Sequence, residues 1–69
     1  MKTELLIIKN NEDYIRVKES QYSCCALDKA SVFPLDRILN VKEHVKYLKN
    51  SGFDRACIYR LILTEIPFS

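Results

Sequence analysis

The chain has 69 residues, 48% of them hydrophobic, and a formal net charge of +2 at neutral pH. That length excludes several domains of ordinary size, so we expect a single domain over residues 1–69. The composition, with one glycine and two prolines, excludes a disordered or low-complexity chain. The weak positive charge does not by itself indicate a nucleic-acid partner.

The N-terminal half of the sequence predicts a β-hairpin and a weaker third strand. Residues 3–9 contain an apolar run on both faces of an extended chain, which is typical of a central strand. Residues 14–18 alternate between polar and apolar side chains, which is typical of a strand with one face in water. Residues 22–27 are a third candidate strand. Polar breaks at residues 10–13 and 19–21 separate the three segments.

Two short turns are expected between the third strand and the helix. Leu27, Ala30 and Phe33 are spaced by three residues, which predicts a single tight turn that folds their side chains inward. Pro34 disfavours helix at the residue before it and favours the start of a second short turn within residues 35–39.

The C-terminal half predicts one amphipathic helix and a closing strand. Asn40 is a favourable N-cap, and Glu43 three residues later completes a capping box. Apolar residues then recur at helical spacing until Gly52 supplies a left-handed stop. Extending the helix backward would place Ile38 off this apolar stripe, so we expect a break or kink near Asn40. Residues 56–63 form an apolar run that predicts a buried strand.

These elements predict an α+β fold. We expect a small, mainly antiparallel sheet of three to four strands: the hairpin, the weak third strand and the C-terminal strand. One helix packs on one face of the sheet and leaves the other face open. That open face is the best candidate for a working surface, and a chain this small can cover it by self-association.

Few residues are spaced for catalysis or metal binding. His44 is the only histidine, and it falls at the edge of the helical stripe, where histidine is usually structural. The three cysteines, Cys24, Cys25 and Cys57, lack the spacing of zinc sites, so we expect reduced thiols that pack as small core residues. We therefore expect no cofactor, no metal, no small-molecule substrate and no enzymatic activity. An active site assembled across a dimer is the remaining alternative.

Lysines gather on one face of the predicted helix, at Lys42, Lys46 and Lys49. One interpretation is contact with nucleic-acid phosphates, where each lysine adds sequence-independent affinity. The other is a solvated helix face, because the overall charge is too weak for a dedicated nucleic-acid binder. We favour the solvated face and keep weak, nonspecific nucleic-acid binding through these lysines as the alternative.

The outer face of the predicted hairpin is a second candidate surface. Tyr14, Arg16 and Lys18 share that face, and Tyr22 in the third candidate strand could extend it. Aromatic and basic residues interleaved on a sheet can stack on single-stranded nucleic acid. They can equally form a protein interface, in which tyrosine and arginine are enriched. Both interpretations stay open at this point.

The order of short motifs is similar to that of small uncharacterised bacterial and phage proteins of one compact domain. The motifs are Ile8-Lys9-Asn10, then Tyr14-Ile15, then Leu27-Asp28-Lys29-Ala30 with Phe33, followed by an amphipathic helix and an apolar strand. The chain resembles that group over most of its length, with Asn11 and Glu12 where a glycine is usual in the first turn. The resemblance implies the order of hairpin, helix and strand, and it implies no substrate.

The leading hypothesis is a non-enzymatic interaction module. It would bind a protein, or a second copy of itself as a homodimer, through the exposed sheet face or a strand edge. The apolar run Leu5–Ile8 is too short for a signal peptide or a membrane span, because Lys9 ends it. We therefore expect a cytoplasmic protein that does not bind membranes.

Overall fold

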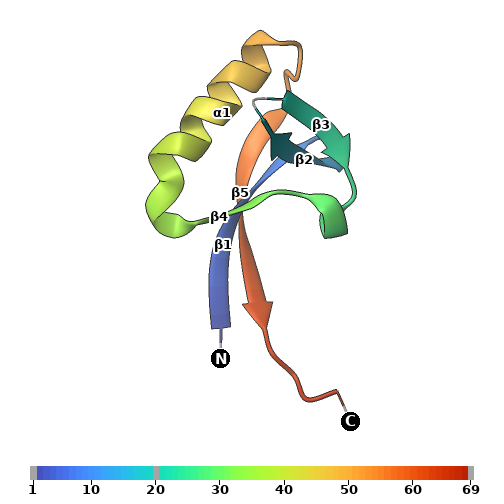
Figure 1. Cartoon of the computed structure of the whole chain (residues 1–69), viewed down its shortest axis with the longest axis vertical. Coiled ribbons are helices and arrows are strands. Elements are labelled where there is room, and N and C mark those ends of the chain that lie inside the picture. Colours follow the sequence, from blue (N-terminus) through green and yellow to red (C-terminus); the bar gives the residue numbers. More distant parts are fainter. Residues whose placement is uncertain (1, 20, 69) are drawn as a thin grey trace.

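The computed structural model describes residues 2–19 and 21–68 and shows one helix packed on the inner face of a curled sheet (Figure 1). The elements in chain order are β1 (Lys2–Asn10), β2 (Asp13–Lys18), β3 (Gln21–Cys25), β4 (Val32–Pro34), α1 (Ile38–Asn50) and β5 (Ala56–Thr64). The predicted α+β class is confirmed, and each strand pair described is antiparallel. The three-residue strand β4 was not predicted. The predicted polar break at residues 19–21 includes Ser20, which lies outside the described residues.

β1 is the centre of the sheet. One of its edges pairs with β5 along the whole strand. The other edge is shared, because β2 pairs with the last two residues of β1 and β4 pairs with Leu5–Ile7. The central position predicted for this apolar strand is confirmed, since Leu6, Ile7 and Ile8 are at most 6% exposed.

The main core lies between the sheet and α1. Leu6 and Ile8 of β1 and Ile15 of β2 meet Val41 and Leu48 of the helix, and all five are buried. Full burial of one such aliphatic side chain contributes roughly 1.5–3 kcal/mol. This cluster therefore supplies much of the free energy that holds the helix to the sheet.

α1 begins three residues before its predicted start, because the residue that precedes it is Arg37 and not Asn40. Asn40 lies in the first turn of the helix, and Arg37, which precedes the helix, makes no side-chain cap. The predicted capping box of Asn40 and Glu43 is therefore wrong. The predicted break exists, but it falls at Arg37 (φ −94°, ψ 18°), where the 3-10 turn Leu35–Arg37 meets the helix. Ile38 packs against the core. The partial burial of this side chain favours a helix that includes Ile38, and the chain forgoes the side-chain cap at Asn40.

The end of α1 follows the prediction. Gly52 has a φ of +104°, which suits glycine because it has no β-carbon. The backbone N–H groups of Ser51 and Phe53 both donate to the carbonyl of Leu48, at 3.0 Å and 2.9 Å. Phe53 packs against the core, and β5 begins three residues later. The left-handed stop is thus confirmed, and the closing strand is present. The prediction that this strand is buried is wrong, because only Ala56 of its nine residues is buried and β5 lies at the edge of the sheet.

The first predicted turn is present, but it does not bury all three of its apolar residues. A 3-10 turn forms at Leu27–Lys29, and Leu27 is 48% exposed. The chain is already extended at Ala30 (φ −73°, ψ 149°). Because the turn ends there, the spacing of three no longer aligns the side chains, and the prediction that Leu27 folds inward is wrong.

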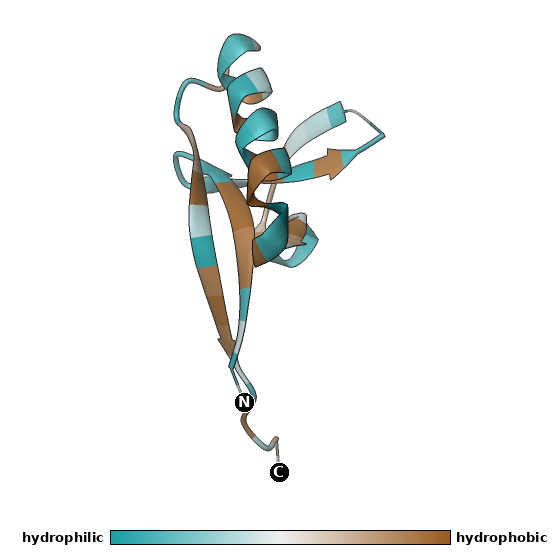
Figure 2. Cartoon of the chain, turned by 90° about the vertical axis from the view of Figure 1, so that its left-hand side faces the viewer, coloured by the Kyte–Doolittle hydropathy of each residue, from teal (hydrophilic) through white to brown (hydrophobic). Residues whose placement is uncertain are grey.

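β1 and β5 continue beyond the rest of the sheet as a two-stranded arm. We define the arm as residues 2–4 and 62–64, where the described pairing joins only these two strands. Figures 1 and 2 show the arm extending away from the helix toward both termini. Figure 2 also shows that the β5 side of the arm is largely hydrophobic.

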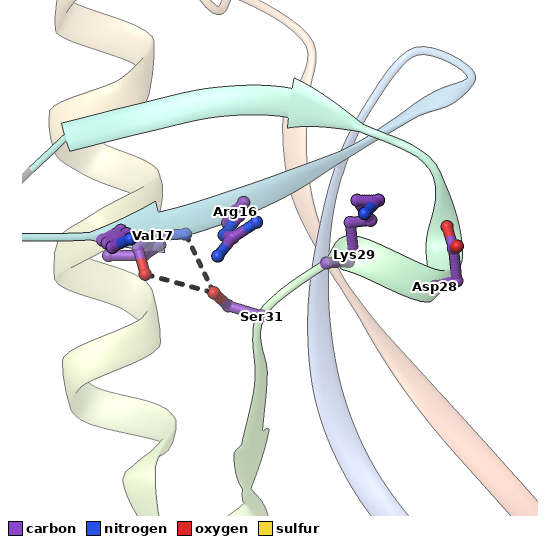
Figure 3. Close-up of a pocket in the computed structure, with 7 residues that line it drawn as sticks. Arg16, Val17, Asp28, Lys29 and Ser31 are labelled. Atoms are coloured by element: carbon purple, nitrogen blue, oxygen red, sulfur yellow. Dashed lines mark hydrogen bonds between the residues drawn. The ribbon is translucent and has the colours of Figure 1, made fainter.

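The curl of the sheet is held by Ser31. β2 leaves β1 after Tyr14, so the edge of β2 needs another partner. The N–H of Ser31 donates to the carbonyl of Ile15 at 3.2 Å. Its hydroxyl accepts the N–H of Val17 at 2.9 Å and donates to the carbonyl of Val17 at 3.3 Å, as Figure 3 shows. One residue thus satisfies three backbone groups of β2.

Replacing this serine should loosen the sheet. Ser31→Ala leaves the N–H and carbonyl of Val17 without their hydroxyl partner, so we expect the free energy of unfolding to fall by about 1–3 kcal/mol. Ser23→Ala, an exposed position on β3, is the matched control and should change it by less than about 0.5 kcal/mol. Urea unfolding of both variants measures the difference. Equal effects would show that Ser31 has no special role.

Candidate interaction surfaces

The outer face of the sheet carries three of the residues considered for an aromatic-basic surface. Tyr14, Arg16 and Lys18 alternate along β2 with the buried Ile15, so they face away from the helix. Arg16 and Lys18 are exposed, and Tyr14 is half-buried. The structure therefore brings these three side chains together on one face.

Lys9 joins Tyr14 to a second tyrosine on this face. Its Nζ lies 5.0 Å from the ring centroid of Tyr14 and 5.2 Å from that of Tyr59. Both distances are within the range of cation–π attraction. The row crosses β2, β1 and β5, whose register places Lys9 between Tyr14 and Cys57. The sequence did not reveal this row because Tyr59 lies far along the chain from Lys9 and Tyr14, and only the pairing of β5 with β1 brings it beside them.

An open hollow of about 520 Å³ lies between β2 and the turn Leu27–Lys29. Arg16, Lys18 and Lys29 supply its positive charges, and Asp28 is the one carboxylate that lines it among the described residues. Figure 3 shows Arg16 on β2 and Lys29 on the turn at this hollow, with Asp28 at the outer end. The lining of the hollow is therefore positively charged.

Arg16 and Lys18 also line a second hollow of about 410 Å³, on the side of β3. Its other lining residues are Glu19, Gln21, Tyr22 and Ser23. In the described part of the chain, the one salt bridge joins Arg60 to Glu4 at 3.3 Å. The basic residues of the two hollows are thus not neutralised by ion pairs.

Tyr22 lies on the other face of the sheet. It is opposite Val17 in the pairing of β2 with β3, and residues directly opposite each other share a face. Its ring packs against the core, and its hydroxyl lies 2.8 Å from Nδ1 of His44. The prediction that Tyr22 extends the outer surface is therefore wrong. The register of β3 decides this, and the sequence alone could not establish that register.

His44 is the centre of an aromatic cluster between α1 and the sheet. Its ring centroid lies 5.7 Å from that of Tyr22 and 5.7 Å from that of Phe33. Tyr47 lies 6.1 Å from Tyr22, and a hollow of about 330 Å³ opens beside these rings. Burial, and then the proximity of Tyr47, raise the pKa of Tyr22 above its ordinary 10.0. His44 occupies the boundary position predicted for it, and its contacts anchor β3 to the helix.

The lysines of the helix form a separate basic surface. Lys42, Lys46 and Lys49 are all exposed on α1, which covers the inner face of the sheet. Arg16 and Lys18 point from the opposite face. None of the three lysines lines a described hollow. Nucleic-acid binding through the helix lysines therefore stays a prediction.

The cysteines do not pack as predicted. Cys24 and Cys57 are exposed and Cys25 is half-buried, and all three thiols are free. The prediction of small core residues is wrong because β3 and β5 are outlying strands, whose side chains are only partly covered. Desolvation, and then the nearby Asp13 and Cys25, raise the pKa of Cys24 above its ordinary 9.0. Within residues 2–19 and 21–68 no group of three or more histidine, cysteine or carboxylate side chains could hold a metal ion.

β5 has the longest free edge among the described strands. It spans nine residues and pairs only with β1 in the described part of the sheet. Apolar side chains project from both faces of the arm, since Ile62 is 49% exposed and Leu63 is 46% exposed. Ile66, just beyond the strand, is 80% exposed. The arm therefore exposes two apolar side chains, Ile62 and Leu63, that the described chain leaves uncovered, and its other residues are polar.

Comparisons with known proteins do not assign a function. The chain matches no protein-family model, no curated protein and no solved structure. The resemblance to small bacterial and phage proteins thus stays a prediction. No helix in the described ranges is long and apolar enough to cross a membrane.

The burial of Tyr22 and its proximity to Tyr47 predict a pH dependence of stability. Because the pKa of Tyr22 is raised in the folded protein, the unfolded chain loses this proton first as the pH rises above about 10. The free energy of unfolding should therefore fall with rising pH in that range, and Tyr22→Phe should make the fall shallower. At pH 7 the same variant should lose about 1 kcal/mol with its hydrogen bond.

Urea unfolding at a series of pH values measures both effects. Ser23→Ala serves as a control variant without a titrating group. The raised pKa of Cys24 contributes to the same alkaline fall and remains in Tyr22→Phe, so the slope should decrease rather than vanish. A slope in Tyr22→Phe as steep as in the natural protein would contradict the prediction.

Proposed function

We propose that this protein is a non-enzymatic interaction module that self-associates through the free edge of β5 and the arm. The observation that carries the proposal is a nine-residue strand with an unpaired edge, among the described residues, and apolar side chains on both faces of its end. Proteins normally protect a long edge strand with charges, prolines or bulges, or they use it to pair with another chain.

The arm needs a partner for energetic reasons. A two-stranded ribbon is at best marginally stable in water, and a third strand or a packed face is what stabilises it. Leu63 and Ile62 remain about half exposed on opposite faces of the arm. Burying the remaining apolar surface at roughly 25 cal/mol per Å² would favour association. The salt bridge between Arg60 and Glu4 is exposed and contributes little.

The sequence of β5 supports a second copy as the partner. Two antiparallel copies can meet with Leu61 opposite the Leu61 of the other copy. That register places Tyr59 opposite Leu63 and Arg60 opposite Ile62, so aromatic and aliphatic side chains pair and no like charges meet. Such a pairing is two-fold symmetric, as most homodimers are. A register centred on Arg60 would instead bring two arginines together.

The size of the chain is compatible with this interface. An interface of standard size takes roughly 800 Å² from each partner. The protein exposes 5580 Å² in total, so the edge of β5, the arm and the exposed Ile66 would have to contribute about a seventh of its surface. We place the affinity at the weaker end, because an edge pairing of this length carries few large apolar anchors.

A matched pair of leucine substitutions tests the proposal. Leu63→Lys introduces a charge into the proposed interface, whereas Leu39→Lys introduces the same charge on α1, where Leu39 is 73% exposed. Sedimentation equilibrium over a range of protein concentrations measures the dimer fraction. We expect a dimer for the natural protein and for Leu39→Lys, and a monomer for Leu63→Lys.

Hydrogen exchange of the dimer locates the interface. The amides of β5 that point away from β1 should gain protection as the protein concentration rises, while those of β3 should not. A strict monomer at the highest concentrations would refute self-association. A dimer in which Leu63→Lys and Leu39→Lys behave alike would place the interface elsewhere.

A further inference from the structure

The outer face combines unpaired positive charge with aromatic rings, at the end of the molecule away from the arm. Arg16, Lys18 and Lys29 converge on the 520 Å³ hollow from two separate segments. None of the three forms a salt bridge within the described residues. Ser31 ties the segment that follows Lys29 to β2, so one backbone hydrogen bond and two hydrogen bonds of the Ser31 hydroxyl hold the two segments together. The hollow thus presents three cationic side chains and the one carboxylate of Asp28 to solvent.

An aromatic row adjoins these cations. Tyr14 and Arg16 are two residues apart on one face of β2, which places them roughly 7 Å apart along the strand. Tyr59 lies beyond Tyr14 in the same row, with Lys9 between the two rings. Tyr59 is 51% exposed, so its ring has surface available for stacking. The outer face therefore carries basic side chains next to the ring of Tyr59, which is about half exposed.

We propose that this outer face binds a single-stranded polynucleotide. Phosphates contact Arg16, Lys18 and Lys29, and a base stacks on Tyr59. Single-stranded nucleic acids bind to grooves that offer positive charge for the backbone and aromatic rings for the bases. An acidic protein segment would use the cations and leave the rings without a role. Open, polar hollows also suit a flexible phosphate chain better than a small apolar ligand.

Matched triple substitutions distinguish this surface from the helix lysines. One variant carries Arg16→Gln, Lys18→Gln and Lys29→Gln, and the control carries Lys42→Gln, Lys46→Gln and Lys49→Gln. Both variants lose three positive charges, and all six positions are exposed. Fluorescence anisotropy of labelled oligo(U) and oligo(dT) of about 12 nucleotides measures binding at about 50 mM and about 200 mM salt. Circular dichroism confirms that each variant is folded.

We expect the natural protein to bind with a log–log salt slope of about −2, as three phosphate contacts to a single strand predict. The outer-face variant should bind at least about tenfold more weakly at the lower salt, with a slope near zero. The helix variant should bind within about twofold of the natural protein. Comparable binding of the two oligonucleotides indicates backbone recognition, whereas a preference for oligo(U) indicates contacts to the ribose hydroxyl.

A second pair of variants tests the stacking. Tyr59→Leu should weaken binding about fivefold or more. Tyr47→Leu, which removes an exposed tyrosine from α1, should not change it. The proposal fails if the natural protein does not bind at the lower salt, or if the two triple variants weaken binding equally. It also fails if polyglutamate of equal charge competes as well as the oligonucleotide, since that would indicate an acidic protein partner.

Discussion

Every layer of this domain depends on the burial of β1 on both of its faces. Leu6 and Ile8 face α1, and Ile7, which faces the other way, is only 1% exposed although no helix within residues 2–19 and 21–68 covers that side. Its neighbours in register are Tyr59 on β5 and Val32 on β4. The sheet can supply these neighbours because β2 turns away after two paired residues and leaves room for β4. α1 thus buries one face of β1, and the curl of the sheet brings neighbouring strands close enough to bury the other.

This arrangement divides the surface into two regions of different chemistry. The curled end carries the basic and aromatic side chains of β2, together with the turn that Ser31 holds in place. The arm carries exposed aliphatic side chains and one exposed ion pair. The buried residues of β1 begin at Leu6, so no described part of the core covers the side chains of the arm. The two proposed surfaces meet at Tyr59 of β5, so self-association and nucleic-acid binding would influence each other.

Local chemistry explains what could be predicted from the sequence. Gly52 and the spacing of apolar residues mark the helix end, and alternation marks the faces of β2, because these signals act within a few residues. The predicted start of α1 is wrong because Ile38 packs against the core within the helix, a tertiary contact that the local cap signal at Asn40 does not reveal. The face of Tyr22 depends on the register of the β2–β3 hairpin, in which a shift of one residue would move its side chain to the other face. The place of Tyr59 in the row through Lys9 depends on the pairing of β1 with β5, two segments far apart along the chain, and no local pattern carries that information.

The pairing of β1 with β5 determines the order in which the chain can fold. Lys2 lies opposite Thr64, so nearly all of the described chain forms a loop that must close before β1 has both neighbours. Loop closure costs entropy before its contacts form, and pairing between distant segments therefore slows folding. The β2–β3 hairpin and α1 rely on local contacts and can form within microseconds. During synthesis on the ribosome, the apolar run Leu5–Ile8 keeps an open edge until β5 has been translated, and in that interval it is exposed to aggregation.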